Sequence, residues 1–500
     1  MSIATKLIRG SAVNLIDHGV KVVAMFVTTP LMLERLGQDD YGVWIIALTL
    51  IGYLRLLDLG VSFAGTRFLG QALGAGDNVR YHAQLGSLSY LYSRISLASL
   101  LVTALLTLVV PAFLGDDSFP AATRWIVLGL GITTSIRFST RIFEVVLKSH
   151  LRYDSIGLSS ITKTLIQTAL LIAVLTTRPS LPTVVLVFIL TDVLDQVLLV
   201  FLSRRTFPES FPLFPAQRPP GIGAIIRYSS TSMIASLGSQ LRNGVAPLVI
   251  AHFLGLSQVA PYSVGSRFLT LFTDIVNAIF GGNFIAAFSH LDGRNDHDAL
   301  VANFLKTLRF SSATATLGGG MLAVFGPPFI ERWIGPSFSE AGKILLILVA
   351  PTTVMLMQYP TRGFIYSQDK QHWLVWIMFA GGVFNAVLGI ILTPGMGVTG
   401  PAVATAAELL IVSGILIPVI TARYCRIPLH AYLRTLLESA APPLLLSVVF
   451  HFVASQTKPD TYLGIFSLGA VFLALSIPLL WIFTFSKPDR DRILSLMRNR

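Results

Sequence analysis

The sequence has little charge and almost no cysteine. Only 12% of its 500 residues are charged, whereas 53% are hydrophobic, and the mean hydropathy is +0.71. So many apolar side chains cannot be buried in an ordinary globular core, which excludes a water-soluble protein. The single cysteine, Cys425, excludes an intrachain disulfide and a cysteine-rich metal site.

Several catalytic motifs are also missing. The sequence lacks the Walker A, HExxH and GxSxG patterns, and the segment EAGK at Lys343 has no glycine at the required upstream spacing. We therefore do not expect ATP-driven pumping by this chain alone. The sequence predicts no metal and no cofactor, other than H⁺ or Na⁺ as a coupling ion.

Long apolar runs recur along nearly the whole sequence. Each is long enough to cross a bilayer core of about 30 Å, so we predict an all-α polytopic membrane protein with about fourteen transmembrane helices. No cleavable signal is expected before the first span, because MSIATKLIRG lacks a small-residue cleavage site. The predicted spans are 11–33, 43–63, 86–112, 122–147, 156–176, 182–203, 224–252, 259–289, 304–330, 341–366, 371–393, 398–422, 435–455 and 462–484.

Basic residues in the loops predict the orientation, because positive loops are retained in the cytoplasm. With the N-terminus inside, the outer loops hold only Arg35, Arg124, Arg178, Arg332, Lys343 and Lys458. Both termini are therefore predicted to be cytoplasmic. The same bias explains most of the net charge of +12, so no nucleic-acid partner is expected. The basic tail SKPDRDRILSLMRNR is expected to attract anionic lipid.

An internal repeat suggests that the chain is duplicated. Arg9 and Leu36 recur as Arg227 and Leu254 at an offset of 218 residues, and Arg141 recurs as Arg362 at an offset of 221. We predict two pseudo-symmetric six-helix lobes that surround a central cavity, with two further helices. The predicted parts are an N-lobe (1–203), a proline-rich cytoplasmic linker (204–223), a C-lobe (224–422), and the last two helices with the tail (423–500).

Four predicted helices carry a polar stripe at helical spacing. A charge at mid-bilayer costs about 2.5–3.5 kcal/mol on insertion scales, so these stripes are expected to face a hydrated interior. The stripes comprise Asn14, Asp17, His18, Lys21 and Thr28; Thr134, Arg137, Arg141, Glu144 and Lys148; Ser229, Ser232, Ser236, Ser239 and Asn243; and Ser263, Arg267, Thr270, Asp274 and Asn277.

The stripes leave two interpretations open. Local ion pairs could hold the helices together, for example Asp17 with Lys21, Arg55 with Asp58, or Arg141 with Glu144. Alternatively, the arginines outnumber the nearby acids and bind an anion. Phosphate is a suitable anion, because it matches the rigid fork of guanidinium donors. We predict diphosphate contacts by Lys21, Arg55, Arg137, Arg141, Arg242 and Arg267.

Other polar residues receive different predictions. Asn14, Asn243 and Asn277 are candidates for binding sugar hydroxyls, and Asp17 is the candidate for ion coupling. Asp192 and Asp195 could satisfy Lys163 or lie near the membrane surface, and together with Glu408 these residues are assigned no role.

Two stretches resemble a known family. They are LGQDDYGVWIIALTLIGYLRLLDLGVSFAGTRFLGQALGAGD (36–77) and FNAVLGIILTPGMGVTGPAVATAAELL (384–410), with Asn385 in a helix and Gly397 and Gly400 at a turn. They are similar to the polysaccharide and O-antigen flippases of the multidrug/oligosaccharidyl-lipid/polysaccharide (MOP) exporter superfamily. Pro401 departs from the small residue expected after the glycine.

The resemblance implies a function and partners. It implies a flippase of the bacterial inner membrane that moves polyprenyl-diphosphate-linked oligosaccharide outward by alternating access, for surface polysaccharide synthesis. Glycosyltransferases and a polysaccharide polymerase are the implied protein partners. A cation or drug antiporter of the same superfamily, supported by Asp17, is the main alternative. A membrane polymerase or ligase is disfavoured because the outer loops are short.

Overall fold

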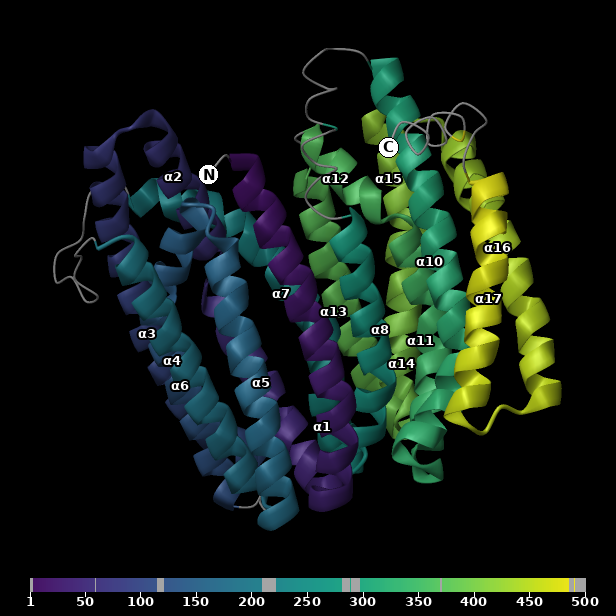
Figure 1. Ribbon diagram of the computed structural model, residues 1–500, viewed down its shortest axis with the longest axis horizontal. Helices are drawn as coiled ribbons and strands as arrows, with labels where there is room; N and C mark the ends of the chain where they lie inside the picture. Colours follow the sequence, from purple (N-terminus) through teal and green to yellow (C-terminus); the bar gives the residue numbers. More distant parts are fainter. Residues whose placement is uncertain are drawn as a thin grey trace. The chain divides into compact units, whose positions relative to one another are not determined.

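The described part of the chain is entirely helical apart from short connections (Figure 1). The computed structural model describes residues 3–58, 60–114, 121–208, 222–280, 288, 297–368, 371–484 and 490. This architecture confirms the predicted all-α class. Most of the predicted linker (204–223) and nearly all of the basic tail lie outside the described residues, so the predicted lobe boundaries stay predictions.

The chain divides into two compact units. Unit 1 comprises 1–240 with 250–260, and unit 2 comprises 241–249 with 261–500, so α7 contributes to both. The helices of unit 1 are α1 (Ile3–Leu54), η1 (Arg55–Asp58), α2 (Val61–Ala75), α3 (Asn78–Leu114), α4 (Ala121–Ser149), α5 (Tyr153–Thr177), α6 (Leu181–Thr206) and most of α7 (Ile222–Leu254).

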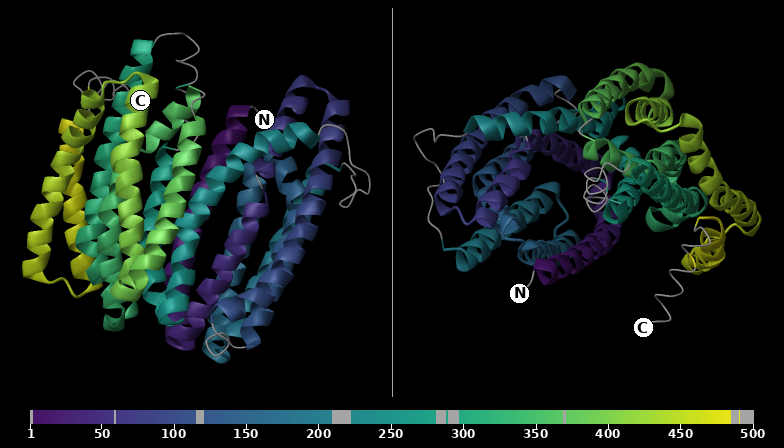
Figure 2. Two further views of the ribbon diagram at one scale, coloured as in Figure 1. Left: turned by 180° about the vertical axis from the view of Figure 1, so that it is seen from behind. Right: turned by 90° about the horizontal axis from the view of Figure 1, so that it is seen from above.

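Unit 2 holds the remaining helices. Its last two helices pack beside α10, as Figure 2 also shows. The helices are α8 (Val259–Phe280), α10 (His297–Ile334), η3 (Pro336–Phe338), α11 (Ser339–Met357), α12 (Tyr359–Ser367), α13 (Gln371–Met396), α14 (Thr399–Leu409), the π-helical η4 (Leu410–Leu416), α15 (Ile417–Cys425), α16 (Leu429–Thr457) and α17 (Tyr462–Phe483).

The α1 helix contains two of the predicted spans. Gly37 interrupts it with φ 82° and ψ 174°, a backbone conformation that favours glycine because it has no Cβ. The predicted span 43–63 is wrong at its end. The helix stops at Leu54, a 3₁₀ turn follows over Arg55–Asp58, and α2 begins after Gly60, which has φ 75°.

Eleven segments in the described residues are long and apolar enough to cross a membrane, so the protein is multi-pass. The first of them, Ala12–Ala75, contains two predicted spans. The predicted spans 224–252 and 259–289 coincide with α7 and α8, which are not among the eleven. These two differences account for the larger predicted number.

The core of unit 1 fixes the position of α4. Phe138 and Ile142 are buried against α2 and α3, which leaves the neighbouring Arg137 and Arg141 on another face of the same helix. The close approach of α2 depends on Gly65, whose Cβ would lie 2.9–3.0 Å from Leu88 and Val145. This packing determines where the α4 arginines lie.

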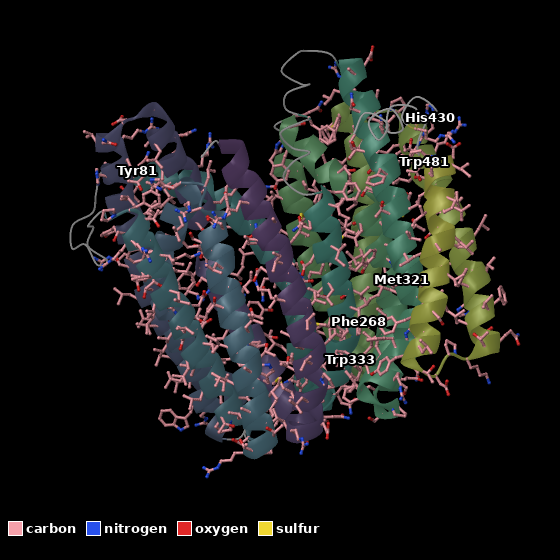
Figure 3. The ribbon with its side chains drawn as sticks, in the orientation of Figure 1. Tyr81, Phe268, Met321, Trp333, His430 and Trp481 are labelled. Carbon is pink, nitrogen blue, oxygen red and sulfur yellow. The ribbon has the colours of Figure 1, made fainter. Side chains whose placement is uncertain are left out.

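Aromatic rings fill the core of unit 2. Phe304 stacks between Phe364 and Tyr432, with ring centroids 4.3 and 6.0 Å away. Near the lower end of this unit in Figure 3, Phe268 meets Trp333 edge to face at 5.7 Å. Because Phe364 belongs to α12, the aromatic core also anchors the short helix that carries Tyr359 and Arg362.

The α13–α14 hairpin has the predicted glycine turn. Gly397 has φ 62°, and a Cβ on Gly400 would lie 2.9 Å from the Leu392 backbone. Asn385 donates to Thr405 Oγ1 at 2.9 Å and joins the two helices. Pro401 lies in the first turn of α14, where its missing N–H removes no helical hydrogen bond.

Candidate functional site

The unit 1 cluster joins three helices through ion pairs. It consists of Arg137 on α4, Lys163 on α5, and Asp192 and Asp195 on α6. Arg137 donates to Asp195 and lies 3.4 Å from Asp192, while Lys163 donates to the same Asp192. The cluster therefore contains two cations and two carboxylates, and Lys163 pairs with Asp192, which is one of the two alternatives that the sequence left open.

Neighbouring polar side chains support this cluster. Ser159 donates to the second oxygen of Asp195 at 2.7 Å. Thr140 donates to Gln196 at 3.2 Å, and the Gln196 amide donates to the Thr133 carbonyl at 3.4 Å. The buried polar groups beside the cluster thus find partners within unit 1, which is the usual condition for burying them.

Two of the local ion pairs that the first interpretation offered as examples are not formed. Arg141 does not pair with Glu144, because Glu144 accepts from Lys148 at 2.6 Å one turn along α4. Asp58 does not pair with Arg55, because it faces α4, where its Oδ1 lies 3.7 Å from Arg141 Nε. A single sequence could not distinguish these partners because each acid has a basic residue three or four positions away.

Among the predicted diphosphate contacts of unit 1, Arg55 is the one without a carboxylate partner within ion-pair distance in the described residues. It is exposed at the start of η1, within electrostatic range of Arg137, Arg141 and Asp192, and it forms no ion pair with the residues that the structure describes. Its position beside two arginines that are already paired gives this region a surplus positive charge.

The stripe on α1 forms a separate pair. Lys21 donates to Asp17 at 2.7 Å, so this example of the local ion-pair interpretation is formed. Asp17 is buried, whereas Lys21 and Asn14 are exposed. The second oxygen of Asp17 has no hydrogen-bond partner in the described part of the chain.

A buried ion pair lies at the centre of the unit 2 cluster, which consists of Arg242, Arg362 and Glu408. Arg242 on α7 donates to Glu408 on α14 at 2.5 Å. The Glu408 side chain is fully buried and that of Arg242 is 9% exposed. Glu408 Oε2 and Arg242 Nε have no hydrogen-bond partner within the described ranges. The π-helical η4 begins two residues after Glu408.

Arg362 adds a second guanidinium to this cluster. It lies within electrostatic range of Arg242 and Glu408, and it has no ion pair among the described residues. Its guanidinium lies 5.7 Å from the centre of the Tyr359 ring, and the Tyr359 hydroxyl donates to Asn277 on α8. Unit 2 therefore brings a predicted sugar-binding amide close to an arginine without a carboxylate partner.

The structure places the other predicted residues on helix surfaces. Asn243 is exposed on α7 and Arg267 is exposed on α8. The sequence analysis did not select Arg362 or Tyr359. The signal for Arg362 was present, because the repeat aligns it with Arg141, a selected residue. Substrate binding and ion coupling by all of these residues stay predictions.

The described residues contain no group of three or more His, Cys, Asp or Glu side chains that could hold a metal ion. Both clusters instead combine guanidinium or ammonium groups with carboxylates. Such donors match an anion with several oxygens, since guanidinium groups form charge-assisted hydrogen bonds in a fixed geometry.

The sequence comparisons identify the family. Residues 33–342, more than half of the chain, match the family described as "Polysaccharide biosynthesis protein". The chain belongs to this family. It is also 21% identical over 495 residues to the uncharacterized membrane protein EpsK of Bacillus subtilis (strain 168), with 94% of each chain covered.

Solved structures identify the fold. The chain is similar to the lipid II flippase MurJ in an inward closed conformation, with a TM-score of 0.70, 13% identity, and coverage of 95% of this chain and 99% of that one. It is also similar to an inward-facing multidrug resistance MATE family transporter of the MOP superfamily. For that structure the TM-score is 0.64, the identity 12%, and the coverage 82% and 96%. These similarities confirm the fold that the resemblance implied, and the family match supports the resemblance itself.

Proposed function

We propose that this protein is a flippase that moves a polyprenyl-diphosphate-linked oligosaccharide from the cytoplasmic to the outer leaflet by alternating access. The proposed location is a bacterial inner membrane with both termini in the cytoplasm. Membership in a polysaccharide biosynthesis family and a fold shared with a lipid II flippase support the proposal. A sugar head group with a diphosphate cannot cross hydrocarbon unaided, because its polar groups would lose their hydrogen bonds.

The surplus arginines are the main observation behind this proposal. Arg55 in unit 1 and Arg362 in unit 2 lie within electrostatic range of other arginines, and neither forms an ion pair with a carboxylate among the described residues. Within a membrane protein, a cation next to a like charge is unfavourable unless an anion binds there. A diphosphate is an anion of the right chemistry, since guanidinium groups remain charged and bind phosphate oxygens in pairs.

A flipping assay in proteoliposomes tests the proposal. A fluorescent polyprenyl-diphosphate oligosaccharide is incorporated, and its movement is followed by loss of accessibility to an impermeant quencher. We expect Arg55→Gln and Arg362→Gln each to lower the rate by about tenfold or more, because a charged hydrogen bond contributes about 1.5–3 kcal/mol. Arg434→Gln is the matched control, since Arg434 is exposed on α16 and pairs with Glu438 within that helix.

The outcomes separate the candidate functions. Wild-type flipping in both arginine variants would contradict the proposed role of these arginines. No flipping by the wild type, with transport of an organic cation dependent on Asp17, would favour the antiporter alternative. The buried carboxylate of Asp17, with one oxygen lacking a hydrogen-bond partner among the described residues, is the observation that supports this alternative.

A further inference from the structure

A groove lies on unit 1, apart from the ion pairs of the charged cluster. It has a volume of about 650 Å³ and runs between α4 and α6. It is lined by Ile136 and Thr140 of α4 and by Val193, Gln196, Val197, Val200, Phe201, Arg204 and Arg205 of α6.

The walls of the groove are apolar and face outward. Ile136, Val193, Val197 and Phe201 are 48%, 42%, 58% and 55% exposed, respectively. The two uncharged polar residues of the lining, Thr140 and Gln196, are hydrogen-bonded to one another. The walls therefore suit a hydrocarbon chain and offer few free polar groups to a sugar.

One end of the groove carries two adjacent arginines. Arg204 and Arg205 are both exposed in the last turn of α6, and neither forms an ion pair with a described residue. The Arg204 guanidinium lies 5.5 Å from the centre of the Phe143 ring, which holds it against the helix surface. The groove is thus apolar along its length and doubly positive at one end.

The length of the groove matches one leaflet. From Val193 to Arg205 the helix advances about 18 Å, at a rise of about 1.5 Å per residue. Half of a hydrocarbon core of about 30 Å is about 15 Å. A lipid with its acyl chain along the groove would therefore bring its head group to the two arginines.

We propose that this groove is a binding site for an anionic phospholipid of the bilayer. Its acyl chain lies against Val193, Val197 and Phe201, and its phosphate contacts Arg204 and Arg205. Basic residues at the membrane surface between transmembrane helices are typical of sites for anionic head groups. This lipid stays bound to unit 1 and is not the transported molecule, so the inference does not depend on the proposed function.

The alternative to lipid binding is that Arg204 and Arg205 only stabilise the end of α6. Cations in the last turn of a helix stabilise the helix dipole, and this effect requires no groove. Lipid binding requires an open groove, whereas stabilisation of the helix dipole does not. A bulky residue halfway along the groove should therefore affect only lipid binding. Val197 is suitable for this change, since it is 58% exposed and its enlargement does not disturb the core.

Retained lipid can be measured on the purified protein. The protein is exchanged into nanodiscs of phosphatidylcholine with a small fraction of phosphatidylglycerol, extracted, and its bound lipid counted by native mass spectrometry. We expect the wild type to retain phosphatidylglycerol. Arg204→Gln/Arg205→Gln should lower retention about tenfold, and Val197→Trp should also lower it, with the unfolding temperature unchanged in both.

A second arginine pair provides the matched control. Arg423 and Arg426 are also exposed at a helix end, and Arg423 lies over a tyrosine ring, but they line no part of this groove. Their replacement by Gln should leave retention unchanged. The proposal would be overturned if both double variants lost phosphatidylglycerol equally, or if the Arg204/Arg205 variant retained as much as the wild type. Displacement of phosphatidylglycerol by polyprenyl phosphate at equal concentration would also overturn it.

Discussion

The charged clusters of the two units differ in burial and in balance. In unit 1, Arg137 has two carboxylate neighbours, and its side chain is 32% exposed. In unit 2, Arg242 has only one carboxylate partner in the described part of the chain, the fully buried Glu408. Arg362 adds a second positive charge nearby. In unit 1, either carboxylate can therefore neutralise Arg137 when the other is removed, whereas the unit 2 cluster depends on one carboxylate. This difference predicts how strongly each cluster responds to substitution.

The largest effect is expected for Glu408→Gln. Removal of one charge from a buried pair leaves the other uncompensated, which costs about 3–5 kcal/mol. The melting temperature of the purified protein should therefore fall markedly. The double variant Arg242→Met/Glu408→Leu should recover most of the loss, since apolar residues can replace a buried pair. An unchanged melting temperature in Glu408→Gln would show that the pair does not stabilise unit 2.

Asp195→Asn should have a smaller effect. Arg137 keeps Asp192 at 3.4 Å, so the expected loss is about 1–3 kcal/mol, the cost of one lost hydrogen bond to a charged group. The double variant Asp192→Asn/Asp195→Asn should lose more than the sum of the single variants, because the two acids substitute for one another. A loss in Asp195→Asn as large as in Glu408→Gln would contradict the redundancy of unit 1.

Gly381→Ala tests the packing around Glu408. The new Cβ would lie 2.6 Å from Glu408 Oε1 and 2.9 Å from Val412, so the carboxylate must shift. We expect a loss of about 1 kcal/mol. Gly389→Ala on the same helix is the control, because its Cβ would meet only Ala404 at 3.9 Å. Equal melting temperatures for the two variants would mean that Glu408 can move without loss.

The smallest effect is expected for Lys21→Gln. The Lys21 side chain is 48% exposed, although that of its partner Asp17 is only 11% exposed. Water and the new Gln amide can replace part of the lost contact, so we expect a loss of less than about 1 kcal/mol. The melting temperature should hardly change, and it should change less than in any variant above. A large fall in melting temperature would show that the pair on α1 stabilises unit 1 strongly. This would contradict the view that burial of both partners determines the size of the effect.

The sequence predicted the helices better than the contacts between them. Apolar runs indicate where helices lie, and Gly397 marks the turn that the family resemblance implied, because these are local properties. Partners such as Arg242 and Glu408 are 166 residues apart and could not be derived from spacing. The Asp17 and Lys21 pair could be considered from the sequence, because the two residues lie four positions apart on one helix.

That Arg362 was not selected as a site residue shows a further limit of the sequence. Its neighbours are Arg242 on α7, Tyr359 on α12 and Glu408 on α14, so its surplus charge becomes visible only when these helices pack together. The repeat already aligned Arg362 with Arg141, yet Arg141 has Asp58 as a partner. Aligned positions therefore have different electrostatic surroundings in the two units.

Binding of a fluorescent polyprenyl diphosphate to the protein in nanodiscs tests the central claim most directly. If Arg55 and Arg362 await a diphosphate, the variant Arg55→Gln/Arg362→Gln should bind it about tenfold or more weakly, and Arg434→Gln should bind it like the wild type. Equal affinity in all three proteins would contradict the claim that the surplus arginines receive the anionic head of the substrate.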